Sequence, residues 1–275
     1  MSSFVMKSIG NALNATSLVS SKLASKKALS LFASPRKGRY NNDQKRVIDS
    51  AFFEEISYNN LEIATYRWVG KGKTVLLAHG WESNASRWDY ILKDLKDQDY
   101  NIVALDAPAH GRSGGKQFNA VLYSEFISVV AKKFKPEVLI GHSVGGMASV
   151  FSTYLNELPF IEKMVLLGAP AHFTGVFSRY KSMMGFNNRI SNGLDKIVLE
   201  RFGQPVSYFS TADFLKSTTA KGLIIHDKKD RIIPFEDGQL LANRYDNSEF
   251  IITTGYGHGL KDTSLTPKII GFIND

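Results

Sequence analysis

The sequence alternates short apolar segments rich in β-forming residues with segments of helical periodicity, and this alternation constrains the fold more than any other feature. The β-type segments are Thr74–His79, Asn101–Asp106, Glu137–His142, Lys163–Leu167, Gly222–His226 and Glu249–Thr253. Val121–Phe134 and the stretch from Trp88 to Leu95 instead repeat apolar residues at helical spacing. The alternation predicts an α/β fold: a mostly parallel central sheet with helices on both faces. The 275 residues, 43% of them hydrophobic, suffice for one such core.

One long interruption breaks the alternation, from about residue 171 to residue 219. A connection of this length inside a compact domain is usually functional. It contains six large aromatic and methionine side chains: Phe173, Phe177, Tyr180, Met183, Met184 and Phe186.

The net charge of +8 is concentrated at the N-terminus. Residues 1–46 contain nine basic residues and one acidic residue, whereas the remaining residues contain 25 of each. We therefore predict a basic helical leader over 1–46 and a neutral domain over 47–275. A neutral domain gives no support for nucleic-acid binding.

Residues 1–34 of this leader have an amphipathic helical pattern, which Pro35 ends. The apolar face contains Val5, Ile9, Ala12, Leu13, Val19 and Leu23. Three interpretations remain open: a helix that contacts a membrane surface weakly, a mitochondrial presequence, or a helix folded against the body. No apolar run approaches the roughly 20 residues needed to span a bilayer. We expect a cytoplasmic protein, and the first of these interpretations would add peripheral membrane contact through residues 1–34.

The chain contains no cysteine. Thiol catalysis, disulfide bonds and cysteine-ligated metals are therefore excluded. Any nucleophile must come from another residue type.

A candidate nucleophile lies in Gly141-His142-Ser143-Val144-Gly145, a G-x-S-x-G sequence. This pattern is weak alone, but here it follows the apolar strand Val138–Ile140 and begins a helix. A serine on a sharp strand-to-helix turn is held in strained geometry with its hydroxyl exposed above the sheet edge. The alternative is an ordinary glycine-rich turn. We predict that Ser143 is a nucleophile.

A serine hydroxyl needs a base to take its proton. Of the six histidines, His258 is the best candidate, because it follows the last predicted strand and three glycines surround it. His79, His142 and His226 lie in or at the end of predicted strands and are interpreted as structural, whereas His110 would at most form a pocket wall.

The base in turn needs a carboxylate to orient its imidazole. Asp227 and Asp230 both follow the predicted strand Gly222–His226. Asp230 is preferred because it lies further into the loop, nearer the open edge of the sheet, whereas Asp227 would cap a turn.

The order Ser143, Asp230, His258 resembles that of the α/β-hydrolases and differs from that of chymotrypsin-like and subtilisin-like enzymes. Two further segments are similar to family motifs. His79-Gly80-Trp81 resembles the H-G-x turn, and Asp106–Gly114 resembles the D-x-x-G-x-G-x-S loop, with an alanine-histidine pair where glycine is common.

The segment from Ile225 to Pro234 is similar to the one that carries the acid in this family. The resemblance extends over residues 61–273 and does not include residues 1–34. It implies that the insertion at about 171–219 is a small helical cap, whose aromatic and methionine side chains either line an apolar ligand pocket or pack the cap onto the body. It implies an oxyanion hole made by the backbone N–H groups of Trp81 and Val144, and we expect the Trp81 indole to line the substrate pocket.

The resemblance implies a serine hydrolase that cleaves carboxylic esters through an acyl-enzyme. The substrate would be a small, apolar ester; thioesters and lysophospholipids would use the same residues. This chemistry requires no cofactor or metal. The alternatives are a non-catalytic binding protein with the same fold, and a hydrolase of amide or C–C bonds with the same triad.

Overall fold

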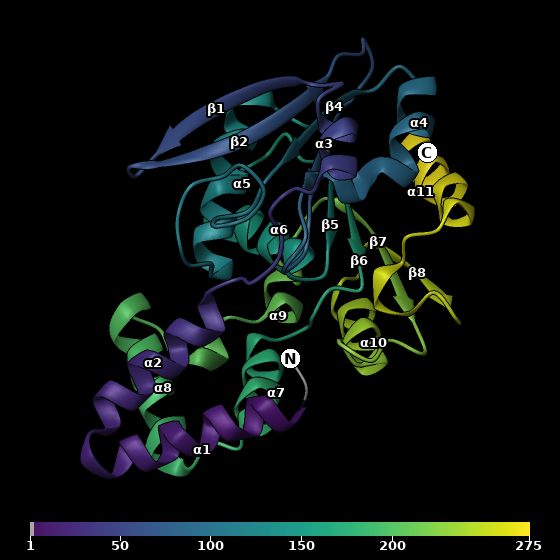
Figure 1. The fold of residues 1–275 in the computed structure, drawn as a ribbon. Helices are drawn as coiled ribbons and strands as arrows, with labels where there is room; N and C mark the ends of the chain where they lie inside the picture. The colour runs from purple at the N-terminus through teal and green to yellow at the C-terminus, as the bar shows by residue number, and fades with distance from the viewer. Residues whose placement is uncertain (1–2) are drawn as a thin grey trace. The chain divides into compact units, whose positions relative to one another are not determined.

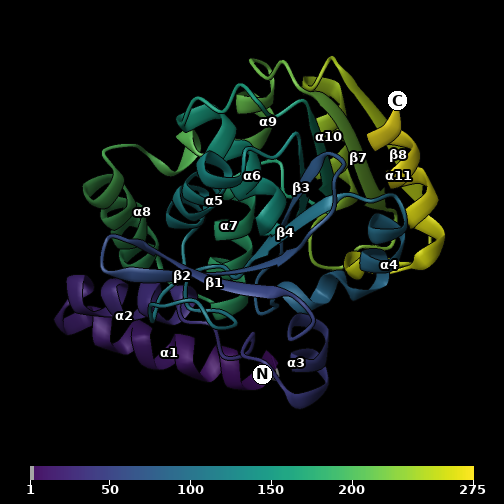
Figure 2. The same ribbon diagram turned by 90° about the horizontal axis from the view of Figure 1, so that it is seen from above.

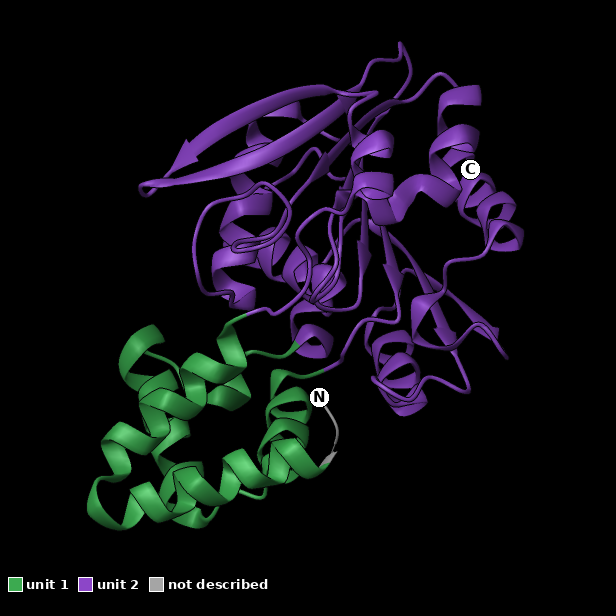
Figure 3. Ribbon diagram, in the orientation of Figure 1, with its two compact units in different colours: residues 1–34, 172–210 green, residues 35–171, 211–275 purple. Residues whose placement is uncertain are grey.

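A computed structural model of the chain describes residues 3–275. It contains two compact units (Figure 3). Of the described residues, unit 1 combines 3–34 with 172–210, and unit 2 combines 35–171 with 211–275. Met1 and Ser2, the first residues of the predicted leader, lie outside the described residues.

Unit 2 is built on a single eight-stranded sheet (Figure 1). Its strands are β1 (Phe52–Tyr58), β2 (Leu61–Trp68), β3 (Thr74–Ala78), β4 (Asn101–Leu105), β5 (Val138–His142), β6 (Lys163–Leu167), β7 (Lys221–Asp227) and β8 (Ser248–Thr253). The spatial order is β1-β2-β4-β3-β5-β6-β7-β8, with β1, β2 and β4 paired antiparallel and all other pairs parallel. The predicted fold class is therefore confirmed.

The hairpin of β1 and β2 was not predicted from the sequence. Most side chains of β1 are exposed, so this strand has no apolar run to reveal it. Asn59 and Asn60 join the two strands with φ angles of 48° and 60°. Asparagine tolerates this left-handed conformation, which two-residue hairpin turns require. The pair of asparagines was therefore the sequence signal from which the hairpin could have been predicted.

Helices cover both faces of the sheet (Figure 2). The helices of unit 2 are α3 (Asn42–Ile48), α4 (Asp89–Asp97), α5 (Ala120–Phe134), α6 (Val144–Leu155), α9 (Thr211–Leu215), α10 (Phe235–Arg244) and α11 (Thr266–Asn274). Helices α5, α6, α9 and α10 follow one another on one face, and α4 packs with α11 on the other. The core under α4 and α11 contains Trp88, Ile91, Ile269 and Ile273, all fully or nearly fully buried.

Residues 35–46, the end of the predicted leader, belong to unit 2. The Tyr40 hydroxyl donates a hydrogen bond to the buried carboxylate of Asp106, at 2.8 Å. The Arg39 guanidinium donates to the backbone carbonyl of Gly111, also at 2.8 Å. These bonds attach the segment to the loop that follows β4.

The described part of unit 1 is formed by the α-helices α1 (Ser3–Val19), α2 (Ser21–Ala33), α7 (Phe173–Met184) and α8 (Asn188–Phe202), with a 3-10 helix at Val206–Tyr208. Residues 3–34 of the predicted leader therefore form two helices and not one continuous helix. The break occurs at Ser20, whose extended backbone leaves α1 and whose hydroxyl accepts the Leu23 N–H as the N-cap of α2. Because of this break, the predicted apolar face from Val5 to Leu23 is not one surface.

The leader helices pack on the helices of the insertion. The Asn14 side chain donates to the Gly185 carbonyl at 2.8 Å and accepts the Asn187 N–H at 2.9 Å. Ser25 of α2 lies so close to α8 that a side chain at Gly193 would collide with its hydroxyl. Polar and small residues therefore make these two contacts, which explains why an apolar pattern did not reveal them.

The aromatic residues of the insertion also pack inside unit 1. The Phe32 ring of α2 lies 5.4 Å from Phe177 and 4.7 Å from Tyr180, between ring centroids. The Tyr180 hydroxyl donates to the Ala28 carbonyl at 2.7 Å. These aromatic side chains hold the leader and the insertion together, a role that neither sequence-based alternative included. No helix among residues 3–275 is long and apolar enough to cross a membrane.

Candidate active site

Ser143 lies at the sharp turn between β5 and α6. Its φ and ψ angles are 54° and −127°, a conformation that a residue with a side chain adopts only under strain. Its N–H donates to the Leu167 carbonyl at 2.8 Å, which ties the turn to β6. A side chain at Gly141 would collide with the backbone of Gly146, so the glycines let the helix return close to the strand.

A chain of two hydrogen bonds joins Ser143, His258 and Asp230. The Ser143 Oγ is 2.9 Å from His258 Nε2, and His258 Nδ1 is 2.7 Å from Asp230 Oδ2. With the proton on Nδ1 donated to Asp230, the unprotonated Nε2 is free to accept the serine proton. The structure thus brings together the three residues predicted as a triad.

The Asp230 carboxylate is held on its other oxygen by the backbone. Its Oδ1 accepts the N–H groups of Ile232 and Ile233, at 2.8 and 2.9 Å. Burial raises the pKa of Asp230, but its hydrogen bonds from His258 and from these amides outweigh burial and leave the pKa below its ordinary value. The carboxylate is therefore ionised when it faces the imidazole.

Asp227, the alternative acid, does not contact His258 in this way. Its two oxygens accept the N–H groups of Lys229, Gly255 and Tyr256 and the hydroxyl of Thr253. It connects the end of β7 to the loop that carries His258. Its side chain is fully buried and holds this loop in place.

The turn after β3 lies beside the nucleophile. Strands β3 and β5 are parallel, and Ala78 is the partner of Gly141. Trp81 comes three residues after Ala78, and Val144 comes three residues after Gly141. A side chain at Gly80 would come within 3.0 Å of Ser143 Cβ. The two predicted oxyanion donors thus lie on adjacent turns at one edge of the sheet. The Trp81 ring is 37% exposed and packs against Phe118, with ring centroids 5.2 Å apart.

Comparison with known proteins identifies this architecture. The sequence model of the alpha/beta hydrolase family matches residues 75–262, a span that includes all three residues of the hydrogen-bonded chain. The chain belongs to the alpha/beta hydrolase family.

Relatives of this hydrolase are distant in sequence. It is 22% identical over 232 residues to the AB hydrolase superfamily protein YisY of Bacillus subtilis, covering 70% of this chain and 87% of the relative. It is 24% identical over 210 residues to a monoacylglycerol lipase of Mycolicibacterium smegmatis, covering 62% and 74%. In structure it is similar to an esterase of Exiguobacterium antarcticum, with a TM-score of 0.61 at 19% identity, covering 82% and 99%.

Two buried side chains of the hydrolase hold the backbone around His258. The His142 imidazole donates to the His258 carbonyl at 2.8 Å, and the Arg87 guanidinium donates to the Gly259 carbonyl at 2.7 Å. Burial lowers the pKa of His142 well below its ordinary value and lowers the pKa of Arg87 to about 10. Arg87 was missed by sequence reasoning, because it comes from a short 3-10 turn (Ala85–Trp88) more than 150 residues away.

We expect Arg87→Met to lower kcat by about tenfold to a hundredfold while changing KM little. The substitution keeps an unbranched side chain but removes the donor to Gly259, and small misplacements of a catalytic group are costly. Steady-state kinetics on a chromogenic ester would measure this. An unchanged kcat would show that the loop holds His258 without Arg87.

Two other histidines serve as neutral scaffold residues. His79 donates from Nδ1 to the Gly80 carbonyl and accepts the Ala107 N–H at Nε2, at 2.8 and 2.9 Å. His110 donates to the Pro108 carbonyl and accepts the Glu82 N–H, at 2.9 and 3.0 Å. Both are fully buried, so His110 is structural and does not form a pocket wall. Burial lowers the pKa of each to about 4.

These two pKa values predict that the hydrolase loses stability as the pH falls from about 6.5 to about 4. In this window the unfolded chain binds protons that the folded chain does not, so lower pH favours unfolding. Each histidine is expected to cost about 2 kcal/mol at about pH 5 relative to neutral pH. Urea unfolding at both pH values would measure the difference. An unfolding free energy that stays constant between them would contradict the neutral state of these residues.

The predicted loop from Asp106 to Gly114 is also structural. Asp106 is fully buried and accepts hydrogen bonds from the hydroxyls of Tyr40 and Tyr66 and from the N–H groups of Ala85 and Arg112. It thereby connects the β4 loop to the turn that contains Arg87. The loop supports the site and supplies none of the three residues of the hydrogen-bonded chain.

Proposed function

We propose that this hydrolase cleaves carboxylic esters through an acyl-enzyme on Ser143. The observation that carries the proposal is the continuous hydrogen-bonded chain from Ser143 through His258 to Asp230. The relative named as a monoacylglycerol lipase supports an ester substrate. The proposal extends to thioesters, because the same residues would act on them.

In the first half-reaction, His258 Nε2 takes the proton of Ser143 as the Oγ attacks the carbonyl carbon. Asp230 keeps the imidazole in the required tautomer and stabilises the imidazolium. The backbone N–H groups of Trp81 and Val144 donate hydrogen bonds to the carbonyl oxygen, on which the negative charge develops. A donor of this kind typically contributes about 3 to 4 kcal/mol to transition-state stability.

The imidazolium then gives its proton to the leaving alcohol, which leaves the acyl group on Ser143. In the second half-reaction His258 deprotonates a water molecule, and the resulting attack releases the acid and returns the proton to Ser143. The exposed indole of Trp81 beside Phe118 supports an apolar substrate of medium chain length or with an aromatic group.

The proposal is tested by labelling with a fluorophosphonate and by a hydrolysis screen. We expect one covalent adduct, mapped to Ser143 by mass spectrometry, and hydrolysis of p-nitrophenyl esters that improves from acetyl to medium chain length. Labelling without hydrolysis of any ester or thioester would favour amide or C–C bond cleavage. Absence of both would favour a binding protein.

A further inference from the structure

Unit 1 carries most of the net charge of the chain. It contains nine basic and two acidic residues, a net charge of +7 out of +8. Both acidic residues lie on α8, where Asp195 pairs with Lys181 and Glu200 with Lys196. Helices α1 and α2 contain no acidic residue at all. The lysines of the leader are therefore not neutralised by acidic neighbours on their own helices.

Apolar side chains are exposed where α1 meets α2. Leu18 is 68% exposed, Val19 is 93% exposed and Leu23 is 48% exposed. Single exposed apolar residues are ordinary, but these three lie within six consecutive positions, on the two sides of the break at Ser20. The α1–α2 corner is defined by these three residues together with three exposed lysines of α2: Lys22, Lys26 and Lys27.

The exposure follows from the way in which the leader packs. Asn14 and Ser17 face the turn between α7 and α8, where the Ser17 hydroxyl accepts the Asn187 amide at 2.9 Å. Val19, five residues after Asn14, points to another side of the helix. Leu18 follows Asn14 by about one helical turn, but it lies in the last turn of α1 and is exposed. On α2, Ala24, Ser25 and Ala28 are buried. Part of the surface of each helix therefore packs within unit 1, and the rest remains exposed.

We propose that the α1–α2 corner is a docking surface for an anionic lipid bilayer. Apolar side chains at the level of the acyl chains and lysines at the level of the headgroups are the combination that surface-bound helices use. A symmetric contact between two copies would bring the lysines of both corners together, which like-charge repulsion opposes. An acidic protein would complement the charge of the lysines but not the exposed apolar side chains. The inference concerns unit 1 and does not rest on the chemistry of Ser143.

Co-sedimentation of the full-length protein with vesicles tests the proposal. We expect the protein to sediment with vesicles of equimolar phosphatidylcholine and phosphatidylglycerol at low ionic strength, and not with phosphatidylcholine alone. Added salt should release it, because screening shortens the reach of the lysine charges.

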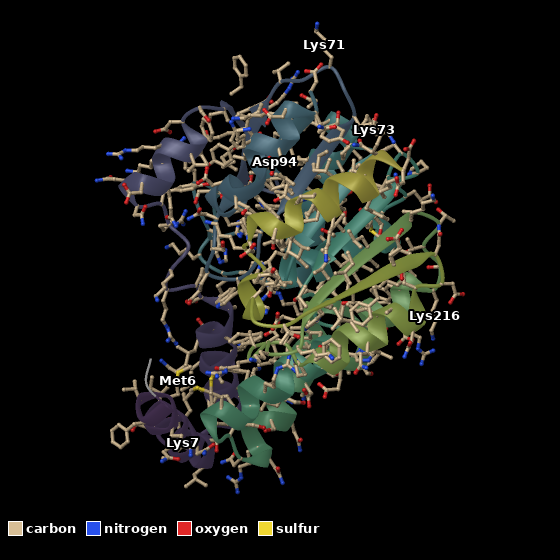
Figure 4. The ribbon with its side chains drawn as sticks, turned by 90° about the vertical axis from the view of Figure 1, so that its right-hand side faces the viewer. Met6, Lys7, Lys71, Lys73, Asp94 and Lys216 are labelled. Carbon is tan, nitrogen blue, oxygen red and sulfur yellow. The ribbon has the colours of Figure 1, made fainter. Side chains whose placement is uncertain are left out.

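Charge substitutions identify the surface. The triple variant Lys22→Gln, Lys26→Gln, Lys27→Gln should bind the anionic vesicles on the order of a hundredfold more weakly, at about fivefold per lysine. The matched control is Lys71→Gln, Lys116→Gln, Lys268→Gln, which removes the same charge from exposed positions of unit 2. Lys71, for example, projects away from the loop between β2 and β3, whereas Lys7 lies on α1 (Figure 4). The control should retain most of the binding.

Because the chain has no cysteine, Val19→Cys allows a single environment-sensitive fluorophore to be attached at the corner. Its emission should shift to shorter wavelength with anionic vesicles, whereas the same label at Lys71→Cys should not respond. This measurement reports insertion independently of the lysine variants.

Three results would overturn the proposal. Equal sedimentation with neutral and anionic vesicles would show that charge has no role in binding. An equal loss of vesicle binding in both triple lysine variants would show that the attraction depends on the net charge and not on the α1–α2 corner. A label at Val19→Cys that responds to protein concentration and not to vesicles would assign the corner to a second copy. Hydrolysis of a water-soluble ester by both lysine variants should equal that of the parent, which separates this test from that of the proposed function.

Discussion

Ser143→Ala is expected to lower ester turnover by about a million-fold, to the level left by substrate binding and the oxyanion donors. The hydroxyl accounts for this loss because, in the proposed mechanism, it forms the bond to the acyl group. The Ser143 Oγ faces His258 Nε2 at 2.9 Å, and alanine keeps the Cβ while it removes this hydroxyl. Turnover of a p-nitrophenyl ester, with active-site titration to exclude traces of parent enzyme, measures the effect.

A second serine in the same helix is a matched control. Ser152 is fully buried in α6, and its hydroxyl has no hydrogen-bond partner among the described residues. Ser152→Ala should leave turnover close to the parental value. If Ser143→Ala retained parental turnover, the acyl-enzyme and the nucleophile assignment would both be wrong.

The strained backbone at Ser143 gives a further check. Glycine accepts a φ of 54° without steric strain, so Ser143→Gly should lose turnover as Ser143→Ala does and yet unfold at a higher temperature than Ser143→Ala. The relief is on the order of 1 kcal/mol. Such a result would show that the fold bears a cost to present this hydroxyl, which a protein with a purely binding role would have no reason to retain.

The part of the site that is local in sequence could be predicted. A serine in a G-x-S-x-G turn after an apolar strand has its geometry determined by that turn, and the order of Asp230 and His258 after it depends on the order of the strands. The choice of Asp230 over Asp227 needed only the position of each residue relative to the end of β7. These signals lie within a few residues of the side chains concerned.

The remainder depends on contacts that no local pattern encodes. Arg87 donates to Gly259, which is 172 residues further along the chain, and lies in a polar segment without periodicity. Asn14 is polar and would be expected on an exposed face, but it binds the turn between α7 and α8. Strand β1 is mostly exposed and so carries no apolar signal. In each case the partner, and not the residue itself, determines the role.

The last prediction concerns the two aspartates, whose hydrogen bonds assign them different tasks. In Asp230, Oδ1 accepts two backbone N–H groups, and Oδ2 accepts the His258 N–H. In Asp230→Asn, the amide oxygen should remain with the two backbone donors, which leaves the NH₂ group facing His258 Nδ1. The imidazole must then accept at Nδ1 and carry its proton on Nε2, where it cannot receive the serine proton.

Asp230→Asn is therefore expected to lower kcat on the order of 10⁴-fold while the protein remains folded. Asp227→Asn should behave in the opposite way. Each oxygen of Asp227 accepts two hydrogen bonds, so an NH₂ group at either position faces at least one N–H and leaves it unsatisfied. The expected cost is about 1 to 3 kcal/mol of unfolding free energy, with a smaller loss of kcat.

Kinetics and urea unfolding of both variants under the same conditions separate these roles. The diagnostic result is a crossed pattern, in which Asp230→Asn ranks lower in kcat and Asp227→Asn ranks lower in stability. Equal losses of kcat would mean that the loop held by Asp227 positions His258 as strictly as the carboxylate of Asp230 does. A larger loss of kcat in Asp227→Asn at full stability would transfer the role of the acid to Asp227, and the 2.7 Å bond between Asp230 and His258 would then have no catalytic meaning.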